Sequence, residues 1–274
     1  MTAGSTNILH ASDASTTVIT RTQRVRLGRI LLGVLLLVVW HWGAVSLGPD
    51  LLATPLAVAV RVQAMVLSRE FYGHVLVTSG EALGGLLIGG VAGIAAPLLL
   101  RFSPRLTDAL LPYLRAAMGI PKLALTPVLI LWFGLGIPSK IVLIALITFF
   151  MMFEATYAGL QSVEQRLVRM IRILGASEAQ ITREIILNSI LPFIFAAFKT
   201  ALPWSVSAAV VGEFLASEAG LGYLINFARD IGDVTGVCAG VAIVTALVLA
   251  LDLGLSRLQT RSLRWQAIDS RVSL

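Results

Sequence analysis

Six long apolar stretches dominate the chain, and each is long enough to cross a bilayer as a helix. Backbone groups in hydrocarbon must be hydrogen-bonded within a helix or around a closed barrel. Barrel strands alternate apolar and polar side chains, and these stretches do not. The sequence therefore predicts an all-α integral membrane protein with six transmembrane helices. The stretches cover residues 27–47, 75–100, 106–134, 141–160, 189–212 and 237–256.

The composition argues against a water-soluble enzyme. Of the 274 residues, 57% are apolar and 13% are charged, against about 45–50% and about 25% in soluble domains. Three His residues are scattered along the sequence, and a single cysteine, Cys238, cannot form a disulfide within the chain. The phosphate-binding motif G-x-x-x-x-G-K-[ST] does not occur in the sequence. We therefore expect no catalytic site, no metal and no cofactor in this chain.

The basic residues indicate the orientation in the membrane. If the N-terminus is cytoplasmic, fourteen of the 21 Lys and Arg residues lie on the cytoplasmic side and four on the other side. Positive charge in short loops marks the cytoplasmic face of membrane proteins. We predict that both termini are cytoplasmic, and the net charge of +6 is explained without a nucleic-acid partner. The fourteen are Arg21, Arg24, Arg26, Arg29, Arg101, Arg105, Arg166, Arg169, Arg172, Arg183, Arg257, Arg261, Arg264 and Arg271, and the four are Arg61, Arg69, Lys140 and Arg229.

The segments between and beside the spans complete the predicted organisation. Residues 1–26 are rich in Ser and Thr and are predicted to be a disordered cytoplasmic tail. Residues 27–70 hold the first transmembrane helix and an outer loop, and we expect this helix to be retained because no cleavage site follows it. Residues 71–256 form the main transmembrane domain, and residues 257–274 form a second cytoplasmic tail.

The longest cytoplasmic loop, residues 161–188, is predicted to form two short helices. Leu167, Met170, Ile171 and Leu174 follow a spacing that places them on one face of the first helix. The loop is therefore predicted to be apolar on one face and basic on the others. The basic residues of the first helix are Arg166, Arg169 and Arg172.

Capping residues separate the two helices of this loop. Gly175 follows the first helix and suits a left-handed C-terminal cap. Ser177 and Gln180 match a capping box, and Ile181 carries the second helix toward the membrane. The loop either lies on lipid headgroups or projects into the cytosol and docks in a groove of a partner protein. Because the chain has no energy source of its own, we favour docking.

Several stretches resemble a known family of membrane proteins. Residues 171–177, Ile-Arg-Ile-Leu-Gly-Ala-Ser, resemble the cytoplasmic EAA loop of type I ABC importer permeases. Residues 119–136 and 212–225 resemble segments of the nitrate, sulfonate and taurine permeases, and the resemblance covers about residues 70–256 in the same order. Further similar segments are Pro138–Lys140, Thr156–Gly159, Ile185–Leu187 and Leu191–Pro192.

The resemblance implies the type I ABC importer permease fold and a place in the prokaryotic cell (inner) membrane as a multi-pass protein. Two permease copies, two ATP-binding cassette ATPase subunits and an extracytoplasmic substrate-binding protein would form the transporter, with ATP and Mg bound by the ATPase. The substrate would be a small anion such as a sulfonate, taurine or nitrate. The loop residues implied to couple to the ATPase are Arg169, Arg172, Leu174, Gly175, Ala176, Ser177 and Ile181.

Two positions depart from the family pattern. Arg169-Met170-Ile171 stands where the family has Glu-Ala-Ala, and Asn188 stands where a proline is expected. The departures leave the fold expectation intact, because Gly175 is kept. The reversed charge at Arg169 suggests an ATPase with a complementary acidic surface.

Charged and aromatic residues inside the predicted spans are candidates for the translocation pathway. A charge near the bilayer centre costs about 2.5–3.5 kcal/mol, so we expect Lys122 to face the interior and to have a partner. Lys199 is a second candidate, although it could instead reach the membrane surface. Trp204 and Glu213 complete the set, with Glu213 as an outer gate residue. Three other acidic residues, Glu81, Glu154 and Asp252, are expected to be solvated at the membrane surface.

Three prolines, Pro112, Pro121 and Pro127, fall within the stretch 106–134 and predict kinks in its helix.

Two further features bear on the fold and on the mechanism. Gly85, Gly89 and Gly93 are spaced four apart and predict close packing of one helix on another. The alternative function is a proton- or ion-coupled secondary transporter that works without an ATPase, with Lys122, Glu213 or Glu81 as the ion site. The docking loop and the lack of a duplicated half favour the ATP-driven importer.

Overall fold

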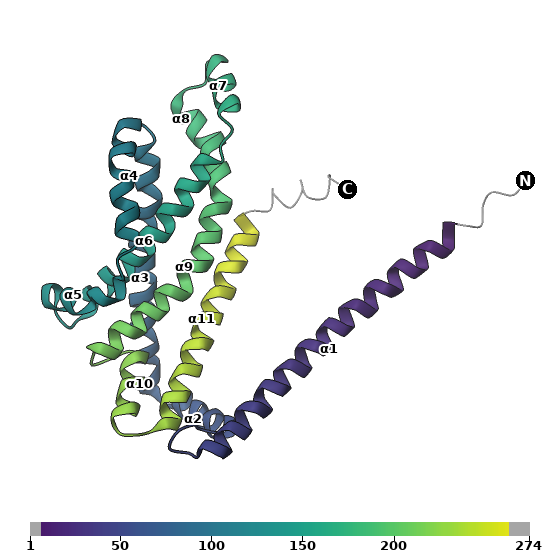
Figure 1. Cartoon of the computed structure of the whole chain (residues 1–274), viewed down its shortest axis with the longest axis vertical. Helices are drawn as coiled ribbons and strands as arrows, with labels where there is room; N and C mark the ends of the chain where they lie inside the picture. Colours follow the sequence, from purple (N-terminus) through teal and green to yellow (C-terminus); the bar gives the residue numbers. More distant parts are fainter. Residues whose placement is uncertain (1–6, 263–274) are drawn as a thin grey trace, which may run out of the picture.

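The computed structural model describes residues 7–262, with the side chains of residue 23 and of residues 25–259. These residues form helices joined by short turns, and no strand occurs among them (Figure 1). The helices are α1 (Asn7–Leu47), α2 (Pro55–Leu67), α3 (Arg69–Leu100), α4 (Pro104–Met118), the 3-10 turn η1 (Lys122–Leu125), α5 (Thr126–Phe133), α6 (Ile137–Gln161), α7 (Gln165–Ile173), α8 (Glu178–Ile181), the π-helical turn η2 (Thr182–Ile186), α9 (Leu187–Leu215), α10 (Leu221–Asp230) and α11 (Val234–Ser262).

Within the described residues, five helices are long and apolar enough to cross a membrane, and the bent pair α4 and α5 makes a sixth candidate. The all-α prediction is confirmed, and five of the six predicted spans lie within these helices. The five segments are Val25–Leu47, Arg69–Leu100, Ile137–Gln161, Glu178–Leu215 and Val234–Gln259.

The third predicted span is broken rather than merely kinked. Pro104–Met118 and the segment Lys122–Phe133 meet at 82°. The break falls at Gly119–Pro121, where Pro121 has no N–H to donate and also restricts the backbone of the residue before it. Pro112, by contrast, lies inside α4 without ending the helix.

The core forms where α3, α6 and α9 pack together. Glycines spaced four apart on α3 allow its close approach to α6. At Gly85, an added Cβ would overlap the side chain of Ile144. At Gly93, an added Cβ would lie 2.8 Å from Cβ of Met152 and 3.0 Å from the main-chain N of Phe153. The packing role predicted for this glycine face is confirmed. The absence of side chains at these glycines lets the backbones of α3 and α6 approach closely.

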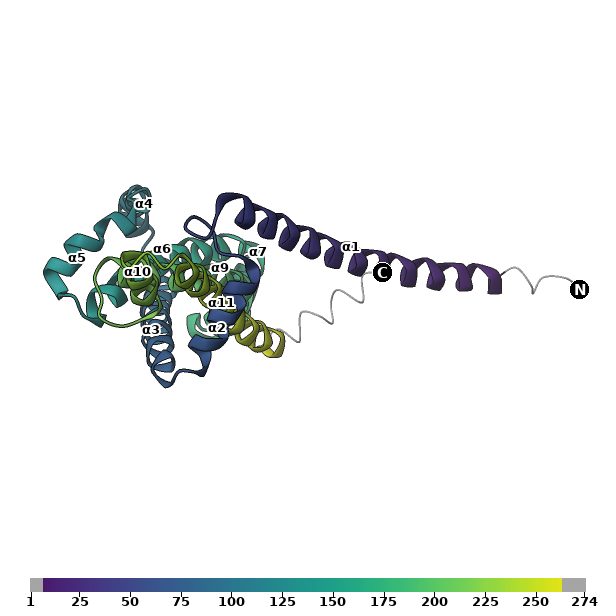
Figure 2. The same cartoon turned by 90° about the horizontal axis from the view of Figure 1, so that it is seen from below.

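Helix α1 stands away from the rest of the bundle, as two views at right angles show (Figures 1 and 2). It meets the bundle at its C-terminal end, where Trp40 donates a hydrogen bond to the carbonyl of Ala53 at 3.0 Å. Residues 7–26, expected to be a disordered tail, are helical in the structure. No Gly or Pro occurs between positions 5 and 27, so nothing in this stretch interrupts the helix. Residues 1–6 and 263–274 of the predicted tails lie outside the described residues.

Candidate functional site

The hairpin formed by α7 and α8 lies at one end of the bundle and α10 at the other (Figure 1). A buried polar cluster contacts the start of α10. The cluster consists of four side chains. Three long helices supply them, and each residue is at most 3% exposed. The four residues are Thr78 and Glu81 of α3, Lys140 of α6 and Glu213 of α9.

Lys140 neutralises one of the two carboxylates in this polar cluster. Its Nζ lies 3.6 Å from Oε1 of Glu81, and it donates hydrogen bonds of 3.1 Å to the carbonyl of Leu135 and to Oγ of Ser217. The sequence predicts that Lys140 lies in an outer loop. In the structure, α6 begins at Ile137, and its first turn places the Lys140 side chain inside the bundle. The prediction that Glu81 is solvated at the membrane surface is wrong, because this residue is 1% exposed.

Glu213 holds the start of α10 against α3. The Thr78 hydroxyl and the backbone N–H of Gly222 each donate a hydrogen bond of 2.7 Å to the Glu213 carboxylate, and the N–H of Leu221 donates to Thr78 Oγ1 at 2.8 Å. The first N–H groups of a helix lack partners within the helix, so these oxygens act as its cap. Gly220 has φ +111°, and an added Cβ there would overlap the Glu213 carboxylate.

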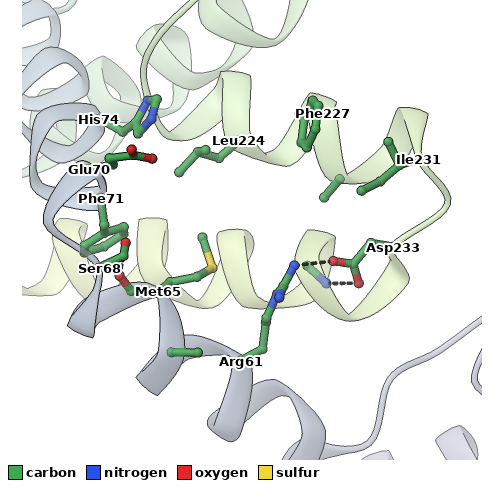
Figure 3. A pocket seen from close by; sticks show the side chains of 13 residues that line it. Arg61, Met65, Ser68, Glu70, Phe71, His74, Leu224, Phe227, Ile231 and Asp233 are labelled. Atoms are coloured by element: carbon green, nitrogen blue, oxygen red, sulfur yellow. Dashed lines mark hydrogen bonds and ion pairs between the residues drawn. The ribbon is translucent and has the colours of Figure 1, made fainter.

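A cavity of about 310 Å³ lies between α2, α3, α10 and α11 (Figure 3). Arg61 forms a 2.7 Å ion pair with Asp233 on its wall. Asp233 also accepts a 2.8 Å hydrogen bond from the N–H of Gly236 and so caps α11. His74 accepts a 3.0 Å hydrogen bond from the N–H of Gly220 at Nδ1.

The hairpin at the opposite end has the caps that the sequence predicted. The N–H of Gly175 donates to the carbonyl of Arg172 at 3.1 Å, and the N–H of Ala176 donates to the carbonyl of Ile171 at 3.2 Å. This pair of bonds is a Schellman motif, and Gly175 has the required positive φ of +92°. The capping box of Ser177 and Gln180 is also present. Both ends of the turn between α7 and α8 are therefore fixed by hydrogen bonds.

The apolar residues of α7 face in two directions. Val168 is buried and Ile171 half-buried against the bundle. Met170, Ile173 and Leu174 are 54%, 86% and 77% exposed. The predicted stripe is therefore divided, with one part anchoring the hairpin and the other part uncovered. Of the residues implied to couple to an ATPase, Arg169, Arg172, Leu174, Gly175 and Ser177 are exposed, Ala176 is half-buried, and Ile181 is buried in the core.

Lys122 finds its partners at the break in the third span. Its Nζ donates hydrogen bonds to the carbonyls of Met118 at 2.6 Å and Ile120 at 3.3 Å, and lies 4.7 Å from the centre of the Phe150 ring. Carbonyls at the end of a helix have no N–H partner within it, and a cation there is favourable. Lys122 therefore caps α4.

The three other pathway candidates lie on α9, but not in one place. Lys199 and Trp204 are on the exposed side of α9, whereas Glu213 is buried in the polar cluster at the end of that helix. The exposed side of α9 is a continuous stripe at helical spacing that the sequence reading did not identify. Its residues are Phe193, Ala196, Lys199, Thr200, Trp204 and Ser207.

Comparison with known proteins identifies the family. Residues 85–265 match the family described as "Binding-protein-dependent transport system inner membrane component". The chain belongs to this family. A permease of this family is a non-catalytic, multi-pass subunit of the inner membrane; ATP hydrolysis resides in a separate ATPase, and a substrate-binding protein is a further partner.

Individual relatives support the same assignment. The permease is 34% identical over 235 residues to the riboflavin transport system permease protein RibX of Chloroflexus aurantiacus, covering 85% of this chain and 88% of the relative. It is 31% identical to the putative aliphatic sulfonates transport permease protein SsuC of Bacillus subtilis, covering 86% and 87%. A chain of the inward-facing MetNI methionine ABC transporter shares the fold, with a TM-score of 0.57, 19% identity and coverage of 69% and 93%.

Proposed function

We propose that this permease forms the translocation pathway for a small organic or inorganic anion, and that it couples to its ATPase through the loop 161–188. Two copies of the chain, two ATPase subunits and an extracytoplasmic binding protein make up the transporter. ATP and Mg are bound by the ATPase. Both termini face the cytoplasm, so the hairpin meets the ATPase on that side.

The observation that carries the proposal is the uncovered face of the hairpin. Met170, Ile173 and Leu174 expose large apolar surfaces on an element whose turn is fixed by two caps. A short helix with exposed apolar residues at this spacing suits insertion into a groove of another protein. Because the turn is already rigid, little conformational freedom is lost when the partner binds. Arg169, also exposed, supplies a charge at the rim of this surface.

The exposed stripe of α9 supports a pathway between two copies of the chain. Lys199, Thr200 and Ser207 place polar groups on a helix side that the described bundle does not cover. The Thr200 and Ser207 hydroxyls donate to carbonyls of α9 itself. The charge of Lys199 would be costly against lipid, so this side belongs against a water-filled pathway or another protein surface. A positive charge along the pathway lowers the cost of removing water from an anion.

The names of the relatives bear on the substrate class. RibX is named for riboflavin and SsuC for aliphatic sulfonates. Sulfonates carry an anionic group, and this agrees with the positive charge that Lys199 contributes to the α9 stripe. A sulfonate, taurine or nitrate is the substrate class that we propose for this permease.

Reconstitution in proteoliposomes tests the proposal. The permease together with its ATPase and binding protein should accumulate a radiolabelled sulfonate only when ATP is present, and the permease alone under a proton or sodium gradient should accumulate none. Leu174→Asp should abolish co-purification of the ATPase, whereas the exposed control Leu131→Asn, on α5, should keep it. Uptake by the permease alone, driven by an ion gradient, would show that the protein is a secondary transporter.

A further inference from the structure

Arg101 joins the cytoplasmic-side end of α3 to the hairpin. It follows the last residue of α3, and its Nη2 donates a 2.5 Å hydrogen bond to Oγ1 of Thr182, the first residue after α8. The Thr182 hydroxyl donates in turn to the carbonyl of Glu178 at 2.6 Å. The Thr182 hydroxyl therefore accepts a hydrogen bond from Arg101 and donates one to the backbone of α8.

The surroundings of Arg101 favour this contact. Its guanidinium lies 4.3 Å from the centre of the Phe102 ring, and a cavity of about 210 Å³ separates it from Arg172 and Glu178 of the hairpin. Burial lowers the pKa of Arg101, while the Glu178 carboxylate acts against this shift. Glu178 also forms an ion pair with Arg172 at 2.5 Å, so α7, α8 and the end of α3 share one charge network.

Helix α3 is continuous from Arg69 to Leu100, with Pro97 in its last turn. Its glycine face brings the backbones of α3 and α6 into contact, as at Gly93, where an added Cβ would lie 3.0 Å from the main-chain N of Phe153. From Arg101 to Glu81, α3 spans about 30 Å at the usual helical rise. At its far end, Thr78 and Glu81 belong to the polar cluster that holds α10. A displacement of Arg101 along the axis of α3 would therefore also displace Thr78 and Glu81 at the other end of the helix.

We propose that Arg101 is a positioning residue through which the hairpin moves α3, and that α3 carries this movement to the polar cluster at the other end of the bundle. The inference rests on the proposed function, because it assumes that the ATPase moves the hairpin. The hydrogen bond to Thr182 is the link that transmits force between the two. The π-helical turn that begins at Thr182 gives the hairpin its own freedom relative to α9.

Variants of this link should separate assembly from coupling in the reconstituted transporter. Thr182→Val and Arg101→Met remove the acceptor and the donor with little change in side-chain volume. Both should keep the ATPase bound and hydrolysing ATP, while solute transported per ATP hydrolysed falls about tenfold or more, the effect of losing a charge-assisted hydrogen bond. Thr182→Ser keeps the hydroxyl and should restore the wild-type ratio. Arg105→Met, an exposed arginine on the neighbouring α4, is the matched control and should leave the ratio unchanged.

The double variant tests whether the two residues act as one link. Arg101→Met combined with Thr182→Val should be no worse than either single variant, because both remove the same hydrogen bond. The inference is overturned if Thr182→Val and Arg101→Met transport normally, if Thr182→Ser is as impaired as Thr182→Val, or if the two effects add. Failure of the wild-type chain to bind an ATPase is a different result, since it contradicts the proposed function itself.

Discussion

Replacement of Lys140 by methionine tests whether the polar cluster holds the bundle together. Lys140 is the cation that faces two buried carboxylates, Glu81 at 3.6 Å and the neighbouring Glu213. Removing one member of a buried ion pair costs about 3–5 kcal/mol, because the remaining charge has no compensation. For chains of about 150–250 residues, 1 kcal/mol corresponds to roughly 2–4 °C in Tm. Lys140→Met should therefore lower Tm by about 6–20 °C.

A double-mutant cycle assigns this cost to the ion pair. Lys140→Met combined with Glu81→Gln removes both charges of the pair, and we expect it to recover about 2–3 kcal/mol relative to additive single effects. Lys199→Met, an exposed lysine on α9, is the matched control and should stay within about 0.5 kcal/mol of wild type. Thermal unfolding in detergent, followed by circular dichroism, measures wild type, the two single variants, the double variant and the control. A Lys140→Met protein as stable as the control, or additive effects in the double variant, would refute the reasoning.

Three further predictions concern packing and docking. Gly89→Ala should destabilise the permease by about 1–3 kcal/mol, because the added Cβ would lie 2.8 Å from Cα of Ala145. Gly80, on the same helix, has open space around it, so Gly80→Ala should be neutral or stabilising in the same unfolding assay. Gly175→Ala places a side chain at φ +92° and should cost about 1–2 kcal/mol, seen as weaker co-purification of the ATPase. Arg169→Glu should lose the native ATPase in a pull-down, and Arg166→Glu, its exposed neighbour, should retain it; unchanged assembly and transport by the first variant would remove the idea of a complementary acidic surface.

The elements that local chemistry determines were predictable. The span predicted at 141–160 matches α6, because a long apolar run has one stable form in a bilayer. The caps at Gly175 and Ser177 were also predictable, since each depends on residues within one turn. The break in the third span was foreseen only as kinks, because the direction of the chain after Pro121 depends on what it packs against.

The polar cluster could not be assembled from the sequence. Glu81, Lys140 and Glu213 come from three helices, and only the packing of α3, α6 and α9 brings them together. Lys140 lies at the start of an apolar run, and position alone fits a surface loop as well as a buried turn. A signal was nonetheless present, because Glu81 lies within an apolar span, where an unpaired charge is costly and requires a partner.

The orientation of the hairpin also could not be predicted from the sequence. The apolar stripe of the first hairpin helix was predicted, but the division of its residues between the bundle and the exposed face depends on how the hairpin sits on α9. Val168 is the buried anchor of α7 and Ile173 is its most exposed large apolar residue, although neither belongs to the predicted stripe. Periodicity identifies an amphipathic helix but not the angle at which it packs.

Site-specific photocrosslinking from the hairpin tests the central claim most directly. A photoreactive amino acid placed at Ile173 or Leu174 in the native membrane should form a covalent product with the ATP-binding subunit, and the yield should change when ATP is added. The same probe at Trp42, an exposed residue of α1, should not react with that subunit. Crosslinks from Ile173 and Leu174 to lipid alone would contradict the account.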